Sequence, residues 1–452
     1  MNSILQLKGR FEQRSNRSRP GSPKLPKGKS VSASHLRELE KQLERILVYW
    51  TENKDIRGAL VSVHYKHIVA KSNRLKILLS ENGKSPTESI RGAKFVWEPD
   101  QKGNEVQKHV FTHFVSLQAI EKSIDVLKKT ASIIEQYYKG SVPSEVIEEL
   151  GEKYHFNEVP KTSFLKTMVD GFYVERFDID RATEEITEEA IITIYQTGVD
   201  TKRLLSKFGI DIVDDRIIDG TTLRLNPDEV KLLYNNASYL IAMGVTDFSE
   251  ISRDDVLDAY EDMEEDAGLL IPHPQNEPVI GVIDTQFNEK VYFHEWVEYK
   301  NLLDPNIPLS RKDYEHGTAV SYIIVDGPQG NPELADGCGR FRVRHFGVAT
   351  NNGFSSFTVL KMIRNIVASN RDIKVWNLSL GSKLEIKPNF ISPEAAELDR
   401  IQSEYDVIFV VAGTNIPSGV TKKNMRIGSP ADSLNSMVVN AVDFAGNSAS
   451  YT

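Results

Sequence analysis

The chain has 452 residues, of which 40% are hydrophobic and 26% are charged, and its formal net charge is −9. This composition is typical of a globular protein and excludes a disordered or a membrane-embedded class, while the length predicts several domains of about 150 residues each. The acidic balance argues against nucleic acid as the main partner, because binding to phosphates requires a clustered cationic surface. No apolar run approaches the ~20 residues of a membrane helix, so we expect no membrane partner.

Cysteine usage and the N-terminal sequence indicate the compartment. Cys338 is the only cysteine, which rules out an intrachain disulfide and removes any need for an oxidising environment. The N-terminal sequence has no apolar stretch long enough for a secretory signal, so we expect a cytoplasmic protein. Cys338 lies between two glycines with no base at a recognisable spacing, and we interpret it as a turn residue rather than a nucleophile.

The first part of the chain is expected to be a basic tail followed by an α+β module. Residues 1–33 contain eight Lys or Arg residues, a single acid and three prolines, so we expect a disordered tail. Residues 34–135 begin with an amphipathic helix and form the N-terminal module, and residues 136–164 are expected to be a linker. The other elements expected in the module are a strand at 59–65, a helix at about 68–81, strands at 92–97 and 110–115, and a helix at about 117–134.

Residues 165–250 show a second pattern, with the element order βαββαβ of the split-βαβ arrangement. The connector that follows, residues 251–278, carries eight acids and no base within 254–266 and then three prolines. Calcium binding would need a regular spacing of carboxylates that this segment lacks, so we interpret it as a solvated linker between domains. The expected βαββαβ elements are strand 172–177, helix 188–208, strands 210–213 and 221–225, helix 228–236 and strand 239–244.

Residues 279–452 change to short apolar runs that alternate with helix patterns. Such runs are typical of a parallel sheet that is buried on both faces, so the predicted fold class is α/β, with a doubly wound parallel sheet preceded by α+β modules. The expected strands are 279–284, 341–349, 373–380, 407–412 and 437–442, and the expected helices are one that starts at His316, one over 355–369 and one over 393–405.

Two residues of this region stand where chemistry is expected. Asp284 ends the first strand, and functional groups of α/β sheets gather at the carboxyl ends of strands. A strand-end Asp alone is more often a cap or a turn residue. His316, however, begins a helix as His-Gly-Thr-Ala-Val, and a buried His needs a partner such as this carboxylate to orient its ring and stabilise its charged form. We therefore expect Asp284 and His316 to pair.

Five sequence blocks, in this order, resemble the subtilase family of serine peptidases. Each block is weak alone, but five in order over about 150 residues on an α/β pattern are specific. The order Asp then His is also that of subtilisin. The blocks are Val282-Ile-Asp-Thr285, His316-Gly-Thr318, Asn377-Leu-Ser-Leu-Gly381, Val410-Val-Ala-Gly-Thr-Asn415 and Ser429-Pro-Ala431.

The resemblance implies a role for each matching residue in a serine endopeptidase that acts on protein or peptide substrates. His316 resembles the general base, Asp284 the residue that orients it, and Asn415 the donor to the oxyanion. The backbone of Ser379, Leu380 and Gly381 would pair with an extended substrate, and Gly353 resembles the opposite edge of the cleft. The implied mechanism needs no metal and no other cofactor.

The chain departs from the family pattern at three places. Thr414 stands where the family usually has Gly, and Ala319 where it usually has a second His. The family's Gly-Thr-Ser-Met-Ala turn, which carries the nucleophile, is absent. We therefore expect the catalytic domain to be incomplete, its serine to lie beyond Thr452 and this chain alone to be inactive. The alternative is a pseudoprotease fragment that binds peptides or a partner without cleaving them.

The resemblance also offers a role for residues 165–250. Many subtilases carry a propeptide of βαββαβ fold that assists folding and occupies the cleft, and the element order here is compatible with one. An unrelated α+β accessory domain fits equally well, because no motif distinguishes the two.

Overall fold

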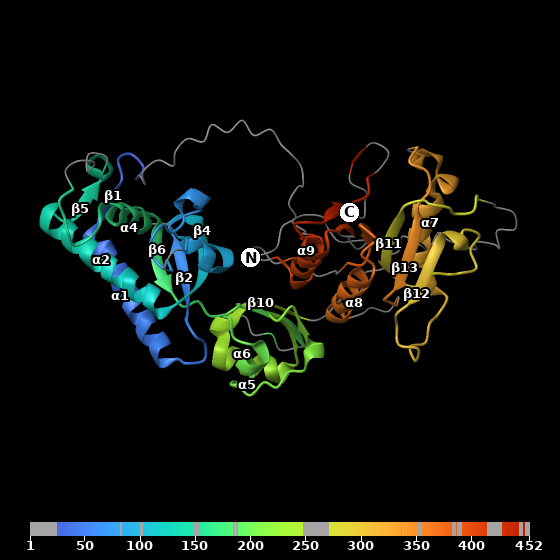
Figure 1. Cartoon of the computed structure of the whole chain (residues 1–452), viewed down its shortest axis with the longest axis horizontal. Helices are drawn as coiled ribbons and strands as arrows, with labels where there is room; N and C mark the ends of the chain where they lie inside the picture. Colours follow the sequence, from blue (N-terminus) through green and yellow to red (C-terminus); the bar gives the residue numbers. More distant parts are fainter. Residues whose placement is uncertain are drawn as a thin grey trace. The chain divides into compact units, whose positions relative to one another are not determined.

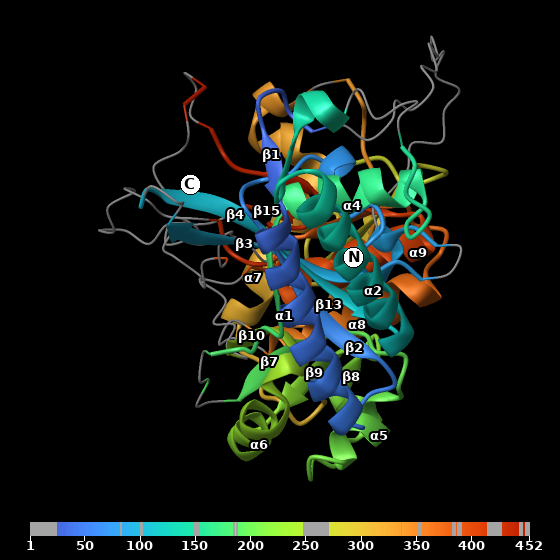
Figure 2. The same cartoon turned by 90° about the vertical axis from the view of Figure 1, so that its left-hand side faces the viewer.

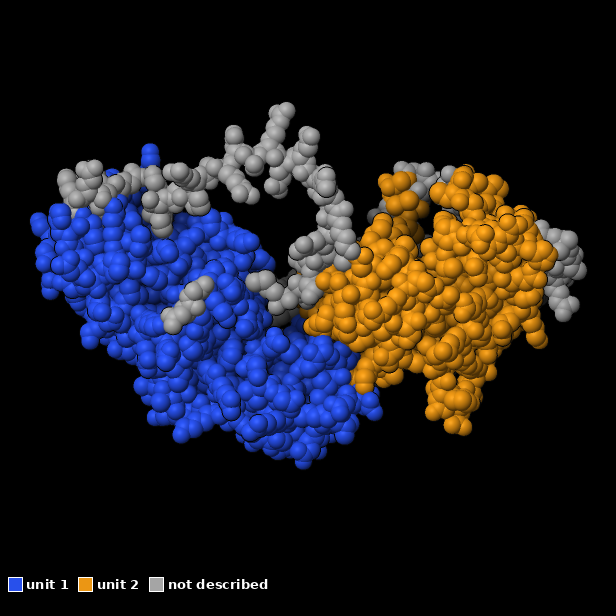
Figure 3. Space-filling model, in the orientation of Figure 1, with its two compact units in different colours: residues 1, 9–245 blue, residues 2–8, 246–452 orange. Residues whose placement is uncertain are grey.

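The computed structural model describes residues 25–81, 84–99, 103–147, 154–183, 186, 189–246, 271–335, 337–350, 355–381, 386, 391–413, 427–442 and 446–447. Apart from the first eight residues, the chain divides into two compact units, residues 9–245 and residues 246–452 (Figure 3). Each unit has a hydrophobic core of its own. None of the helices within the described ranges is long and apolar enough to cross a membrane.

The first unit contains two long helices that lie side by side against an antiparallel sheet (Figures 1 and 2). Helix α1, Ala33–Glu52, buries its leucines at helical spacing, and Ser32 caps it by accepting a hydrogen bond from the backbone N–H of His35. Helix α2, Leu117–Tyr137, packs along α1. The sheet order is β3-β4-β2-β6, with β2 at Ala59–Tyr65, β3 at Ile90–Pro99, β4 at Glu105–Val115 and β6 at Val174–Asp178.

The prediction of a helix over about 68–81 is wrong. That segment holds only a short 3₁₀ turn at Lys71–Asn73. Its backbone is instead held by a distant side chain, because the fully buried carboxylate of Asp170 accepts hydrogen bonds from the N–H groups of Lys76, Ile77 and Leu78 at 2.7, 2.9 and 3.0 Å. Local helix periodicity could not reveal a competing acceptor that lies about ninety residues further along the chain.

Segments expected to be tail or linker also take part in this unit. Strand β1, Ser30–Ser32, pairs antiparallel with β5, Ser141–Pro143, so part of the expected 1–33 tail and part of the expected 136–164 linker are structured. Helix α4, Lys161–Tyr173, leads directly into β6. Strand β6 was expected to open the second module, but it pairs with β2 of the first sheet.

The second sheet of this unit has the order β10-β7-β9-β8. A βαββαβ order is present, but it starts at Ala190, and the helix expected over 188–208 is wrong. Residues 190–194 are rich in isoleucine and form a strand, and Gly198, at φ +72°, lies between this strand and a short helix. The elements are β7 at Ala190–Ile194, α5 at Thr201–Ser206, β8 at Ile217–Ile218, β9 at Thr222–Leu225, α6 at Pro227–Ala237 and β10 at Ile241–Thr246.

The two sheets of the first unit share one continuous core. Tyr239, just before β10, donates a hydrogen bond to Asp55 at 2.9 Å, and its ring packs edge-on against Trp50 of α1. The βαββαβ part is therefore built into the first unit rather than standing alone.

The second unit contains the parallel sheet that the sequence predicted. Its order is β12-β13-β11-β14-β15-β16, and every described strand pair is parallel, which confirms the α/β fold class. Strand β12 is not predicted by the sequence pattern, because this edge strand is largely exposed and lacks an apolar run. The strands are β11 at Val279–Asp284, β12 at Val297–Asn301, β13 at Arg342–Gly347, β14 at Val375–Leu378, β15 at Ile408–Ala412 and β16 at Met437–Val439; the helices are α7 at Lys312–Gly330, α8 at Ser356–Ser369 and α9 at Pro393–Tyr405.

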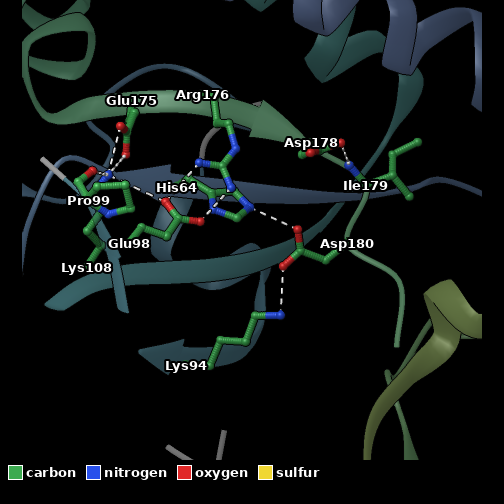
Figure 4. A network of polar contacts seen from close by, with 10 residues as sticks. All are labelled: His64, Lys94, Glu98, Pro99, Lys108, Glu175, Arg176, Asp178, Ile179 and Asp180. Atoms are coloured by element: carbon green, nitrogen blue, oxygen red, sulfur yellow. Dashed lines mark hydrogen bonds and ion pairs between the residues drawn. The ribbon is translucent and has the colours of Figure 1, made fainter. Parts of the chain in front are cut away.

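A network of charged side chains lies across the first sheet (Figure 4). At one end Asp180, in the segment that leaves β6, accepts from His64 at 2.9 Å and from Lys94 at 2.8 Å. Burial by itself would raise the pKa of Asp180, but its hydrogen bond to His64 and the charges of His64 and Lys94 hold the pKa below its usual value. The rest of the network joins Lys108 to Glu175 and Glu98, and Arg176 to Glu98.

We expect Asp180→Asn to lower the free energy of unfolding of the protein by about 1–3 kcal/mol at pH 7, because a neutral amide with one acceptor oxygen cannot accept from both His64 and the Lys94 ammonium group. Because the folded pKa of Asp180 is depressed, its contribution is present above the ordinary carboxyl pKa near 4 and is lost as the pH falls through the folded value. Urea unfolding at several pH values measures both effects.

Asp125→Asn is the matched control, since Asp125 pairs with Lys129 at 2.6 Å on the exposed face of α2. We expect it to change the free energy of unfolding by less than about 0.5 kcal/mol. Equal unfolding curves for the two variants would show that the network does not stabilise the unit.

Candidate active site

Asp284 lies where the parallel sheet predicts a functional group. It is the last residue of β11, pairs in register with Gly347 at the end of β13, and is fully buried. The carboxyl ends of all six strands face the same edge of the sheet, so Asp284 and the residues that follow β14 and β15 are neighbours at that edge.

His316 is brought to Asp284 by helix α7. The helix begins at Lys312, four residues earlier than expected, so His316 lies within it rather than at its start. His316 Nδ1 lies 2.5 Å from Asp284 Oδ1, and the His316 side chain remains 34% exposed. The carboxylate requires a donor, so Nδ1 carries the proton and Nε2 is the basic nitrogen. The expected pair is therefore formed.

The environment of Asp284 favours its charged form. Burial alone would raise the pKa of this carboxyl group, but the charge and the hydrogen bond of His316, together with smaller contributions that include the hydrogen bond from Thr285, hold the pKa below its usual value. Oδ1 also accepts from the backbone N–H of Thr285 at 2.7 Å, whereas Oδ2 is buried with no hydrogen-bond partner among the described residues. A buried carboxylate with a perturbed pKa and a half-exposed His is typical of a catalytic site.

Gly317 allows the helix to approach the strand end closely. A Cβ atom at this position would lie 2.6 Å from the carbonyl oxygen of Gln286 and 2.7 Å from that of Thr285, both of which are backbone atoms. The N–H of Gly317 also donates to Thr285 Oγ1 at 2.9 Å. Any other residue here would push α7, and His316 with it, away from Asp284.

Three of the four expected substrate-binding residues lie just after the strand next to β11, at the same sheet edge as this pair. Ser379, Leu380 and Gly381 follow β14 directly, and Ser379 Oγ accepts from Asn377 Nδ2 at 2.9 Å. Leu380 and Gly381 line a cavity of about 30 Å³. This volume holds one or two water molecules, so the cavity is a small depression and not a complete peptide site.

Glu394 at the same cavity was not selected from the sequence. It lies in the first turn of α9 and accepts hydrogen bonds from Ser356 Oγ and Ser429 Oγ, each at 3.0 Å. Burial raises the pKa of this carboxyl group. Nothing in a single Glu near a helix start signals such a position, because its partners come from two other segments.

The other two expected site residues cannot be placed. Asn415 and Gly353 lie outside the described residues. The structure follows the chain to Gly413, just after β15, where the N–H of Gly413 donates to the carbonyl of Val439 at 2.8 Å. The assignment of Asn415 to the oxyanion therefore stays a prediction.

Residues 275–452 match the model of the subtilase family, Peptidase_S8. No curated protein sequence matches the chain.

Several solved peptidase structures show likeness at low identity. A variant of the epidermin leader peptide processing serine protease EpiP from Staphylococcus aureus is 18% identical, with a TM-score of 0.36, and the match covers 58% of this chain and 72% of that one. The prenylagaramide maturation protease PagA is 18% identical with a TM-score of 0.29, covering 38% of this chain and 57% of that one. The subtilisin-like protease Apa1 from Pseudoalteromonas sp. AS-11 is 18% identical with a TM-score of 0.28, covering 38% of each chain.

This chain therefore spans little more than half the length of PagA and about two fifths of Apa1. The family assignment depends on the sequence match of residues 275–452, which contains the Asp284–His316 pair at the carboxyl edge of a parallel sheet. Residues 275–452, which contain the Asp284–His316 pair, are the part of the chain that is similar to the subtilase family of peptidases.

Proposed function

We propose that the protein is a serine endopeptidase that hydrolyses peptide bonds by acyl transfer. The observation that carries this proposal is the 2.5 Å hydrogen bond between the buried Asp284 and the half-exposed His316. Its single cysteine suits a reducing compartment, and we place its activity in the cytoplasm as part of the proposal.

His316 is the proton carrier in this mechanism. Nε2 takes the proton of the attacking serine hydroxyl as its oxygen bonds to the substrate carbonyl carbon, and Asp284 stabilises the resulting imidazolium. The same proton then passes to the leaving amine when the peptide C–N bond breaks. A water molecule hydrolyses the acyl-enzyme by the same route. Residues 1–452 contain no Gly-Thr-Ser-Met-Ala turn to provide the serine.

The substrate is proposed to bind as an extended strand beside the segment that follows β14, because β14 itself is paired on both sides, with β11 and β15. The backbone of Ser379, Leu380 and Gly381 continues that strand to the edge where Asp284 lies, and two adjoining parallel strands already pair there in register. Asn415 would donate its side-chain N–H to the oxyanion.

We further propose that the first unit inhibits the second in cis, in the manner of a propeptide. The support is the sheet order β10-β7-β9-β8, which with the element order βαββαβ is the split-βαβ arrangement. Because this sheet shares its core with the first sheet, the whole unit would act rather than the βαββαβ part alone.

The peptidase proposal predicts that His316→Ala, made in the protein expressed from its complete gene, lowers kcat by about 10⁶-fold, and that Asp284→Asn lowers it by about 10⁴-fold. These magnitudes are those of triad enzymes in general, subtilisin included. Hydrolysis of a fluorogenic peptide library measures both. The matched control is His294→Ala, an exposed histidine of the same unit, which should leave kcat unchanged. Undiminished hydrolysis by the His316 variant would refute the assignment, and a wild type that binds peptides without cleaving them would support the pseudoprotease instead.

The oxyanion proposal predicts different effects for two neighbouring polar residues. Asn415→Ala should lower kcat by about 10²–10³ with little change in KM, a magnitude taken from the corresponding donor in subtilisin. Thr414→Ala should have a much smaller effect, because its hydroxyl reaches less far and competes for local carbonyls. Steady-state kinetics of both variants decide the point, and the opposite ranking would overturn the assignment of Asn415.

The inhibition proposal predicts that cutting the connector activates the enzyme. A specific protease site is inserted within residues 254–266, and after cleavage and dilution the peptidase activity should rise, because the inhibitor becomes a dissociable partner. Adding back the purified first unit should restore inhibition at micromolar concentration. Activity that is the same before and after cleavage and dilution would identify the first unit as an accessory domain with no inhibitory role.

A further inference from the structure

A second histidine, His345, lies directly behind the Asp284–His316 pair. It is in the middle of β13 and is fully buried, and neither a motif nor its spacing marked it in the sequence. Its ring makes a hydrogen bond at each nitrogen: Nε2 lies 2.8 Å from the carbonyl oxygen of Thr285, and Nδ1 lies 2.9 Å from Ser321 Oγ. Because a carbonyl only accepts, Nε2 carries the proton and Nδ1 accepts from the serine hydroxyl.

These two hydrogen bonds connect the two elements that carry the pair. Thr285 is the residue after Asp284 on β11, and Ser321 is on α7, five residues after His316. The ring also sets the space between them, since a Cβ atom on Gly317 would lie only 2.8 Å from His345 Cε1. The imidazole of His345 therefore links the end of β11 to helix α7, next to the Asp284–His316 pair.

The surroundings of His345 hold its ring in place and keep it neutral. The rings of Phe287 and Tyr299 lie against it, each with its centroid 5.7 Å away. Burial lowers the pKa of His345, and the charge of His316 lowers it further, although the hydrogen bond to Thr285 and the charge of Asp284 act in the opposite direction. A neutral ring keeps the lone pair that accepts from Ser321.

The side chain next to Thr285 strengthens the same arrangement. Gln286 is fully buried, donates from Nε2 to the carbonyl of Ala349 at 2.9 Å, and accepts from the hydroxyl of Tyr299 at 2.7 Å. The segment after Asp284 is thus held from two sides, by His345 through the backbone of Thr285 and by Tyr299 through Gln286. Few degrees of freedom remain for the strand end that presents the carboxylate.

We propose that His345 is a positioning residue of the candidate active site, which sets the distance between Asp284 and His316 by bracing Thr285 against Ser321. Its importance for catalysis depends on the proposed peptidase function, but its effect on the hydrogen bond of the pair does not. A buried histidine that only fills the core would leave that hydrogen bond unchanged when its ring is replaced by an apolar group of similar size.

The test measures the hydrogen bond directly in the 452-residue chain. The distance between His316 Nδ1 and Asp284 Oδ1 is 2.5 Å, and the proton in so short a hydrogen bond gives a far-downfield NMR signal. The signal is assigned by its loss in His316→Gln. We expect His345→Leu to move this signal upfield or abolish it, because the variant leaves the Thr285 carbonyl without its donor and frees the strand end. We expect His345→Gln to retain it, since the terminal amide N–H can still donate to that carbonyl.

A second variant, Ser321→Ala, keeps the proposal testable if His345→Leu does not fold. Ser321→Ala removes only the hydrogen bond to Nδ1, so we expect a smaller shift of the same signal in the same direction, with thermal unfolding close to that of the wild type. If the signal is unchanged in His345→Leu, His345 only fills the core and the proposal is overturned. If His345→Leu does not fold, an unchanged signal in Ser321→Ala overturns the proposal in the same way. A wild type without the downfield signal contradicts the short hydrogen bond and overturns it as well.

Kinetics separate this proposal from the proposed function. In the hydrolytically active protein expressed from the complete gene, His345→Leu should lower kcat by about ten- to a hundredfold with KM nearly unchanged, and His345→Gln should recover most of the loss. If no form hydrolyses peptides while the NMR signal still responds to His345, the peptidase proposal fails and the positioning role stands.

Discussion

The candidate active site depends on how closely two backbones approach. Helix α7 touches the strand end at Gly317, where even a methyl group would collide with the carbonyls of Thr285 and Gln286. This contact brings the imidazole of His316 to 2.5 Å from Asp284, although the two residues are 32 positions apart. A shift of the helix by the width of one methyl group would remove the hydrogen bond between His316 and Asp284. This hydrogen bond therefore depends on the close packing of α7 against the end of β11, and not on the two residues alone.

Burying Asp284 is costly, and the structure shows how the cost is offset. A carboxylate in the interior needs an opposite charge or several donors, and here His316 and the N–H of Thr285 both contact Oδ1. The net result is a lowered pKa, because the charge and hydrogen bond of His316 and the hydrogen bond from Thr285 act together against the effect of burial. An ionised, immobile carboxylate beside a half-exposed imidazole is the arrangement that general-base catalysis requires, and it has little value as a stabilising ion pair.

The first unit uses its charges differently. Its network on the sheet connects four strands and the segment after β6, and most of its carboxylates contact a Lys or Arg (Figure 4). Asp180 lies just before the second sheet of that unit, so its partners fix the chain where it passes from one sheet to the next. Together with the shared core, this explains why the βαββαβ part is one half of a larger unit rather than a separate module.

The sequence by itself determined the α/β class and the identity of the central pair. Strands β11 and β15 are nearly continuous apolar runs, and the Asp and His blocks follow the order of the pattern, so local composition was sufficient. Helix α1 was equally clear from its leucine spacing. These features depend on residues within a few positions of one another.

Only the tertiary structure decided the features that depend on distant partners. Strand β12 is a largely exposed edge strand with a polar sequence. Strand β6 pairs with the first sheet and not with the second. Residues 68–81 do not form a helix, because the carboxylate of Asp170 accepts hydrogen bonds from their backbone N–H groups. His345 and Glu394 acquire their roles from side chains on other elements, which no periodicity records. Sequence periodicity indicates whether a residue lies on the buried or the exposed face of its element. Which side chain it contacts there is decided by how the elements pack in the tertiary structure.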